Sequence, residues 1–147
     1  MAISDFRVEG LCAAPFTPFN ADGSVDLPSI AAHVAELVAQ GVRWAFVAGT
    51  TGEGVCMSVA ERKAVLEAWM AASAGRGVGI IAHVGSEAIA DVQELARHAE
   101  SVGVLAIGAH CTSFNKPPSM DAVVEFLSIV SKGACAGGKG VASWRAG

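Results

Sequence analysis

The sequence predicts an α/β protein built on a parallel sheet, because short apolar runs alternate with amphipathic segments along the chain. Strands are expected at residues 10–14, 44–48, 79–84 and 104–109, which are nearly continuous apolar runs. Such runs are typical of parallel strands, since helices bury both faces of the sheet. Periodicity alone leaves two architectures open, a doubly wound sheet and part of a (β/α)8 barrel.

The segments that follow the first two strands carry helix signals. A turn at residues 20–23 (NADG) precedes Asp26, whose carboxylate can cap a helix N-terminus. Apolar residues then recur at helical spacing, and Gly41 can end that helix in the left-handed conformation. Ser58 and Glu61 form the capping-box pattern at the start of a second helix.

Two more helices and a tail complete the chain. A third helix is expected at residues 91–101, and a fourth begins near Ser119 or Asp121. Residues 132–147 (KGACAGGKGVASWRAG) are rich in glycine and alanine and contain no apolar run typical of a strand. We therefore expect an ordered domain over residues 1–131 and a disordered tail over residues 132–147.

Composition narrows the functional classes. The chain has 147 residues, enough for one domain, and a net charge of −4, which argues against binding to nucleic acid. The longest charge-free stretch, residues 101–115, is shorter than the ~18 residues of a membrane span. Acidic residues near the N-terminus argue against a secretory signal, so a cytoplasmic protein is expected. The cysteines are then expected to be free thiols, at positions 12, 56, 111 and 135.

The loop after the second strand carries the strongest chemical signal. Its sequence, Gly-Thr-Thr-Gly-Glu-Gly over residues 49–54, lies where a parallel strand ends, and ligands bind at such ends. Thr50 and Thr51 offer hydroxyl and backbone N–H donors for a small carboxylate or phosphate. Gly49 and Gly52 are expected to allow close approach and positive φ. The loop matches neither a P-loop nor the dinucleotide fingerprint.

Simpler interpretations remain for this loop and its surroundings. The glycines also fit a tight turn between strand and helix. Glu53 is expected to organise that turn by accepting hydrogen bonds from backbone N–H groups rather than to act as a general acid. His83, His110 and Cys111 follow the third and fourth strands without a recognised spacing for metal ligands, so no metal site is expected.

Several motifs in order resemble the N-acetylneuraminate lyase branch of the pyruvate-dependent class I aldolases, a group that includes dihydrodipicolinate synthase. The loop at residues 49–54, followed by MSVAER at 57–62, carries the resemblance most clearly. Residues 10–18 (GLCAAPFTP), 80–85 (IIAHVG) and 114–117 (FNKP) resemble segments of the family's first, third and fourth βα units. The resemblance covers about residues 7–131 and does not include the glycine-rich tail.

This resemblance implies a fold and a reaction. The family fold is a (β/α)8 TIM barrel, of which this truncated chain would supply the first four βα units. Lyases of this family cleave N-acetylneuraminate to pyruvate and N-acetylmannosamine through a lysine Schiff base, without metal or organic cofactor. The resemblance also suggests that the complete protein assembles as a homotetramer. Carried over to this sequence, Thr50 and Thr51 would hold the carboxylate of pyruvate or of the sugar acid, with Gly49, Gly52 and Glu53 supporting the loop.

The family's catalytic lysine and tyrosine have no counterparts here. The chain contains no tyrosine. None of its lysines matches the Schiff-base position, since they stand at positions 63, 116, 132 and 139. The chain is therefore expected to be inactive alone. Three alternatives stay open: a non-catalytic half-barrel that self-associates or joins full-length subunits, another pyruvate-dependent aldolase such as dihydrodipicolinate synthase, and a doubly wound domain that binds a phosphate ligand.

Overall fold

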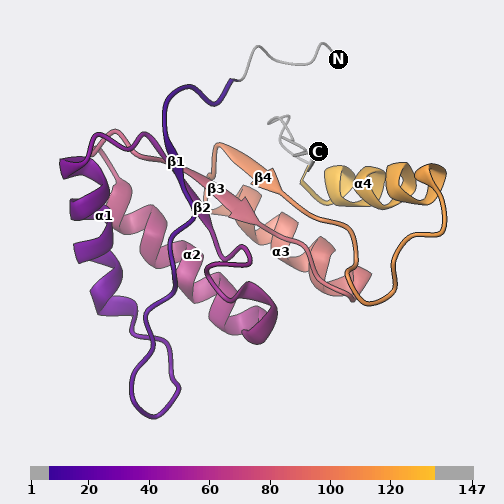
Figure 1. Ribbon diagram of the computed structural model, residues 1–147, viewed down its shortest axis with the longest axis horizontal. Helices are drawn as coiled ribbons and strands as arrows, with labels where there is room; N and C mark the ends of the chain where they lie inside the picture. The colour runs from indigo at the N-terminus through magenta and orange to yellow at the C-terminus, as the bar shows by residue number, and fades with distance from the viewer. Residues whose placement is uncertain (1–6, 135–147) are drawn as a thin grey trace.

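The computed structural model of the protein describes residues 7–134 (Figure 1). Its centre is a parallel four-stranded sheet in the order β1-β2-β3-β4. The strands are β1 (Cys12–Ala13), β2 (Trp44–Val47), β3 (Gly79–His83) and β4 (Ala106–Gly108). They alternate with four α-helices, α1 (Ile30–Ala39), α2 (Val59–Ser73), α3 (Ile89–Ser101) and α4 (Met120–Ala134).

The strand order resolves the two architectures that periodicity left open. Each strand pairs in parallel with the next along the chain, and each helix packs on the following helix. Right-handed crossovers between successive neighbouring strands place every helix on the same face of the sheet. A doubly wound sheet instead reverses its strand order and has helices on both faces. The fold is therefore that of consecutive βα units, as in the first half of a barrel.

The expected elements all form, with small differences at their ends. Each strand is shorter than its apolar run, and α3 begins two residues before the expected position, at Ile89. Helix α4 continues to Ala134, three residues past the expected domain boundary. The remainder of the expected disordered tail lies outside the described residues.

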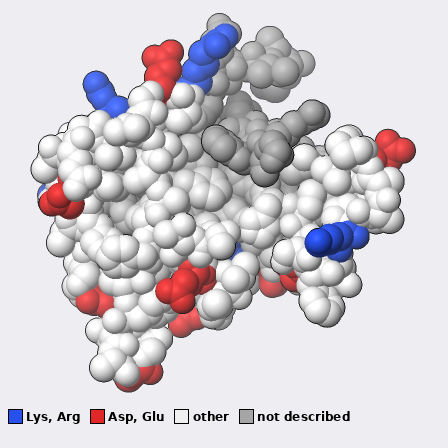
Figure 2. Space-filling model, in the orientation of Figure 1, with Lys and Arg blue, Asp and Glu red and all other residues white. Residues whose placement is uncertain are grey.

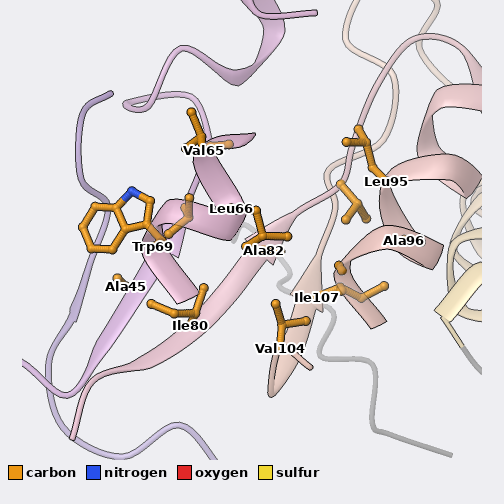
Figure 3. Close-up of a cluster of buried hydrophobic side chains, with 14 of the residues drawn as sticks. Ala45, Val65, Leu66, Trp69, Ile80, Ala82, Leu95, Ala96, Val104 and Ile107 are labelled. Carbon is orange, nitrogen blue, oxygen red and sulfur yellow. The ribbon is translucent and has the colours of Figure 1, made fainter. Parts of the chain in front are cut away.

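The core lies between the sheet and the helices. Ala45, Ile80 and Ile107 are among the strand residues that point toward the helices, and Trp69 of α2, only 1 % exposed, lies beside the first two at one side of the cluster (Figure 3). Leu95 of α3 extends the cluster toward β4. Burial of these apolar side chains is the main force that holds helices and sheet together.

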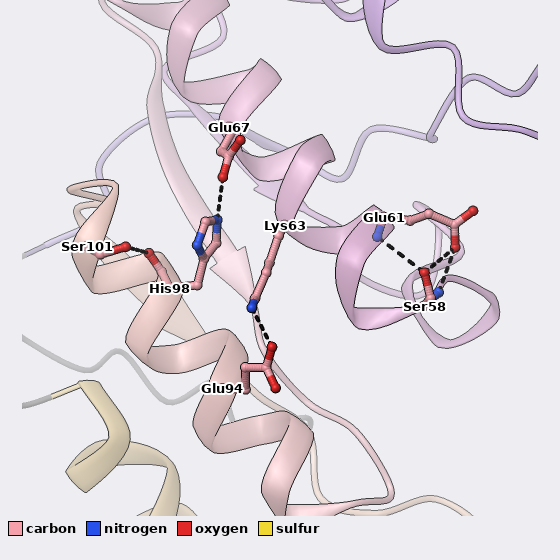
Figure 4. Close-up of polar contacts among 7 residues, drawn as sticks. All are labelled: Ser58, Glu61, Lys63, Glu67, Glu94, His98 and Ser101. Carbon is pink, nitrogen blue, oxygen red and sulfur yellow. Dashed lines mark hydrogen bonds and ion pairs between the residues drawn. The ribbon is translucent and has the colours of Figure 1, made fainter.

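Local signals begin and end the helices as the sequence predicts. The Asp26 carboxylate accepts a hydrogen bond from the backbone N–H of Ser29, although it caps a 3-10 turn (Leu27–Ser29) just before α1. Ser58 and Glu61 form both bonds of the capping box of α2 (Figure 4). Gly41 follows α1 with φ +72°, which glycine adopts without steric cost.

The other face of the sheet carries Trp44 and Phe46, which alternate with the core residues of β2. Glycines on neighbouring strands make room for both rings. A Cβ at Gly79 would lie 2.5 Å from the Trp44 ring, and one at Gly108 would lie 2.6 Å from the Phe46 ring. No helix of the described residues packs on this face, which leaves both aromatic side chains half-buried.

Surface charge, membrane-spanning helices, metal ligands and cysteines were each the subject of an expectation from the sequence. Figure 2 shows charged side chains of both signs, mostly around the edge of the face in view, with uncharged atoms over its middle. Within residues 7–134 no helix is long and apolar enough to cross a membrane, and no group of three or more potential ligands is arranged to hold a metal. Cys12, Cys56 and Cys111 are free thiols, as expected, and Cys135 lies outside the described residues.

Candidate functional site

The loop at residues 49–54 lies at the C-terminal end of β2 and is organised by its own backbone. The N–H of Glu53 donates to the carbonyl oxygen of Thr50, and that of Gly54 donates to the carbonyl oxygen of Gly49, each over 3.1 Å. The positive φ angles belong to Ala48 (+56°) and Glu53 (+54°), not to the glycines of the loop. The expectation that these glycines adopt positive φ is therefore wrong.

Close packing explains the glycines instead. A Cβ at Gly54 would lie 2.0 Å from the carbonyl oxygen of Ala48, and one at Gly52 would lie 3.1 Å from that of Pro15. A Cβ at Gly49 would meet the Phe46 ring at 2.8 Å. The glycines let the loop fold tightly against the ends of β1 and β2, which agrees with the simpler interpretation of a tight turn between strand and helix. Close approach of this backbone to a ligand stays a prediction.

Thr50 and Thr51 are the exposed hydroxyl-bearing residues of this loop. Neither hydroxyl donates to or accepts from another group of the described residues. Both hydroxyls therefore have free hydrogen-bonding capacity at the strand ends. Two such hydroxyls, with the N–H groups beside them, can donate to the oxygens of a small anion.

Thr17 is a supporting residue that sequence reasoning missed. Its hydroxyl is buried and donates to the carbonyl oxygen of Gly52 over 2.7 Å. Thr17 follows β1, so this bond joins the segment after β1 to the loop after β2, one residue beyond the threonine pair. Its signal in the sequence is the segment Pro-Phe-Thr-Pro at residues 15–18, which is part of the resemblance to the family's first βα unit.

Glu53 differs from its expected role. Its side chain is exposed and makes no hydrogen bond to the described residues, so the turn is held by backbone groups rather than by this carboxylate. The left-handed backbone at Glu53 turns the chain toward a short 3-10 helix, Gly54–Cys56, that leads to α2.

A buried polar cluster joins the ends of β2 and β3. The guanidinium of Arg62, from α2, donates to the carbonyl oxygens of His83 at 2.7 Å and Gly85 at 2.9 Å. Nδ1 of His83 lies 3.0 Å from the carbonyl oxygen of Ala48. Both side chains are at most 5 % exposed, so the cluster is part of the framework behind the loop.

Burial lowers the pKa of both side chains of this cluster. It lowers the pKa of His83 to about 4, electrostatic interactions with His110 and Arg62 act in the same direction, and the Ala48 hydrogen bond opposes the shift. His83 is therefore neutral at pH 7. Burial also lowers the pKa of Arg62 to about 10, and the carboxylate of Asp91 opposes that shift. Arg62 remains charged at pH 7.

The loop after β4 lies next to the Arg62–His83 cluster. The ring of His110 lies against that of His83, with the centroids 4.5 Å apart and the planes tilted by 34°. The carboxylate of Glu87 accepts hydrogen bonds from the backbone N–H groups of Ser113 and Phe114, which hold its pKa below the usual value. These bonds tie the β4–α4 loop to the segment after β3.

No lysine of the described residues is placed for imine chemistry. Lys63 pairs with Glu94 across α2 and α3 (Figure 4), and Lys116 and Lys132 are exposed. An amine becomes a nucleophile at neutral pH when burial or a nearby cation lowers its pKa. These lysines lie in solvent or in an ion pair, and Lys139 lies outside the described residues.

Comparisons with known proteins agree with this architecture. The sequence model of the Dihydrodipicolinate synthetase family matches residues 7–134. N-acetylneuraminate lyase A of Xenopus laevis is 43% identical over 135 residues, which are 91% of this chain and 44% of the relative. The chain thus spans about half the length of the curated relatives it matches.

Solved structures also match nearly all of this chain with about half of their own length. N-acetylneuraminate lyase of Proteus mirabilis superposes with a TM-score of 0.89 and 44% identity, over 94% of this chain and 46% of that one. A dihydrodipicolinate synthase superposes with a TM-score of 0.84 and 27% identity, over 95% and 46% of the two chains. With the family model matching most of its length, this chain belongs to the dihydrodipicolinate synthetase family.

Proposed function

We propose that this chain is the carboxylate-binding part of an N-acetylneuraminate lyase-type aldolase, with Thr50 and Thr51 as the groups that hold the carboxylate of pyruvate or of the sugar acid. The observation that carries the proposal is the loop at residues 49–54, which leaves both hydroxyls unpaired at the end of a parallel strand. Identity of 44% to a lyase against 27% to a dihydrodipicolinate synthase favours the lyase branch.

The reaction needs groups that the described residues do not supply. In an imine mechanism, a lysine amine condenses with the substrate ketone and releases water. A base then takes the proton of the substrate hydroxyl while the electron pair of the breaking carbon–carbon bond moves into the protonated imine, so that an aldehyde leaves and an enamine remains. Protonation of the enamine carbon restores the imine, and its hydrolysis frees pyruvate and the lysine amine. Because no described lysine is desolvated, we expect this chain to bind the carboxylate without forming an imine.

Binding is tested by titrating the 147-residue chain with pyruvate and following its backbone amides by NMR. We expect the amides of residues 49–54 to shift. Acetone, which has the ketone but lacks the carboxylate, is the matched ligand control and should leave them unchanged. The double variant Thr50→Val, Thr51→Val keeps the shape of both side chains and should lose the response.

Covalent chemistry is tested separately by intact mass after treatment with pyruvate and borohydride, which reduces an imine to a stable adduct. We expect the 14.9 kDa chain to stay unmodified. An adduct on this chain would contradict the assignment of binding without imine formation. A titration in which pyruvate leaves residues 49–54 unperturbed would overturn the proposed site itself.

A further inference from the structure

His83 makes an unusual set of contacts for a buried side chain. It is 4 % exposed, and its Nε2 atom has no hydrogen-bond partner among the described residues. Its Nδ1 atom has two polar neighbours, the carbonyl oxygen of Ala48 at 3.0 Å and Nη2 of Arg62 at 3.4 Å. A buried polar ring held in this way has a tautomer that its neighbours determine.

The neighbours select the tautomer with the proton on Nδ1. A carbonyl oxygen only accepts hydrogen bonds, so the 3.0 Å contact with Ala48 is favourable only when Nδ1 donates. The alternative, in which Nδ1 accepts from Arg62, would use the longer contact and leave the Ala48 oxygen facing a lone pair. Arg62 already donates through Nη2 to the backbone oxygen of His83 at 2.7 Å.

The ring has no room to turn away from this bond. Nε2 lies against Gly85, where a Cβ would come within 2.8 Å of it. The carbonyl oxygen of Gly85 is held by Arg62 over 2.9 Å, so the backbone that confines the ring is itself fixed. The rings of Phe46 and His110 lie beside it at centroid distances of 5.7 and 4.5 Å.

The bond from His83 ends on the residue that begins the anion-binding loop. Ala48 has φ +56°, a left-handed conformation that costs a residue with a Cβ about 1 kcal/mol or more. Its carbonyl oxygen lies where a side chain at position 54 would begin, so it is also packed against the far end of the loop. A hydrogen bond to this oxygen therefore stabilises the strained residue and both ends of the loop together.

We propose that His83, as the Nδ1–H tautomer confined by Gly85 and Arg62, is a positioning residue that holds the carbonyl group of Ala48 and thereby the geometry of the Thr50–Thr51 loop. Its relevance to ligand binding rests on the proposed carboxylate site. The hydrogen bond from Nδ1–H of His83 to the carbonyl oxygen of Ala48 is inferred from the contacts of His83 alone and does not depend on that site.

Two substitutions of His83 test whether the hydrogen-bond donor at the Nδ1 position matters independently of the imidazole ring. His83→Asn places an amide nitrogen near the position of Nδ1 and can still donate to Ala48. His83→Gln places its amide near the position of Nε2 and cannot make the same bond without moving. His98→Asn, in α3 and without a contact to the 49–54 loop, is the control for loss of a histidine.

The first measurement is the ¹⁵N chemical shift of the imidazole nitrogens in the unmodified chain at pH 7. The expected pattern is a protonated Nδ1 and an unprotonated Nε2 for His83. The opposite tautomer would overturn the proposal, and this result needs neither a variant nor a ligand.

The second measurement is hydrogen exchange of the amides of Glu53 and Gly54, with pyruvate affinity measured in parallel. His83→Gln should speed exchange in the loop and weaken pyruvate binding by about tenfold, the effect of losing one well-made hydrogen bond. His83→Asn should restore both toward the unmodified values. A variant that misfolds is identified by its amide spectrum, and the tautomer result then decides alone.

The outcomes distinguish the two proposals. If pyruvate fails to bind the unmodified chain while the tautomer and the exchange pattern are as expected, the carboxylate site is wrong and the positioning role stands. If His83→Asn and His83→Gln behave alike in both exchange and affinity, the role of the Nδ1 donor is overturned even where pyruvate binds at Thr50 and Thr51.

Discussion

Gly54 shows at the scale of one residue how tightly the loop is folded. Its φ is not in the left-handed region, yet a Cβ there would lie 2.0 Å from the carbonyl oxygen of Ala48. Because that contact is with backbone, no side-chain rotation can relieve it. The position requires glycine for space, whereas Gly41, with φ +72° and no atom within 4 Å of an added Cβ, requires it for conformation.

These two glycines give a matched pair of predictions. Gly54→Ala should lower the free energy of unfolding by about 3 kcal/mol or more, since backbone must shift to remove the overlap. Gly41→Ala should lower it by only about 1 kcal/mol, the cost of a left-handed residue with a Cβ. Urea denaturation of both variants measures the difference, and equal losses would contradict the packing explanation.

His83 gives a prediction on pH at the same scale. Its pKa is about 4 in the folded chain, against 6.5 for an ordinary histidine. Between these values the unfolded chain binds a proton that the folded chain does not, so stability falls as pH is lowered from 6.5 to 4. The difference amounts to about 3 kcal/mol.

The prediction is checked by urea unfolding of the unmodified chain and of His83→Asn at pH 7 and pH 4. The unmodified chain should lose about 3 kcal/mol more than the variant over this range, because the asparagine does not titrate. Other histidines are present in both proteins and largely cancel in the comparison. Equal losses in the two proteins would show that His83 is not held neutral by burial.

At the scale of one element, α2 links the sequence pattern to the site most directly. Its first turn carries the Ser58–Glu61 capping box, its inner face carries Trp69, and its Arg62 bonds to the end of β3. The same helix contacts α3 through the Lys63–Glu94 pair (Figure 4). It also contacts α3 through Glu67, whose Oε1 lies 3.2 Å from Nε2 of His98. A partly exposed ion pair such as Lys63–Glu94 stabilises a protein by less than about 1 kcal/mol, so packing and capping position α2.

Removal of the cap should therefore be measurable. Ser58→Ala leaves an unpaired N–H in the first turn of α2 and should reduce the free energy of unfolding by about 1 kcal/mol. The control is Ser128→Ala in the interior of α4, where the hydroxyl only bonds back to Val124 and the change should be close to neutral. Thermal or urea unfolding compares the two, and a neutral Ser58→Ala would contradict the capping role.

The sequence predicted these elements well because their signals are local. The apolar runs, the capping box and Gly41 each specify a conformation from neighbouring residues. Strand ends were less well predicted, since Leu11 and Leu105 belong to apolar runs but lie outside the paired segments. Pairing ends where the neighbouring strand ends, which is not a property of either segment alone.

At the scale of the whole molecule, the helices of the described residues cover one face of the sheet. Within residues 7–134, β1 and β4 each pair with a single strand, and Trp44 and Phe46 lie on the face without helices. A cavity of about 740 Å³ opens at the N-terminal ends of the strands, beside Trp44 and Leu105. Unpaired strand edges and exposed apolar surface favour association between chains.

We expect the 147-residue chain to self-associate as its concentration rises. Sedimentation velocity over a range of concentrations measures this. Leu105→Lys places a charge beside the β4 edge and should reduce association, while Val124→Lys, on the exposed side of α4, is the matched control and should not. A chain that remains monomeric and melts in one sharp transition would contradict the expectation.

The sequence by itself determined the alternation of strands and helices, the helix caps and the loop that offers Thr50 and Thr51. These follow from periodicity and from residues a few positions apart. The tertiary structure alone decided that Thr17, Arg62 and His83 support that loop, and that its glycines serve packing rather than positive φ. The reason is physical: these contacts join the ends of different strands, and a residue's role there depends on which carbonyl oxygen the fold places beside it.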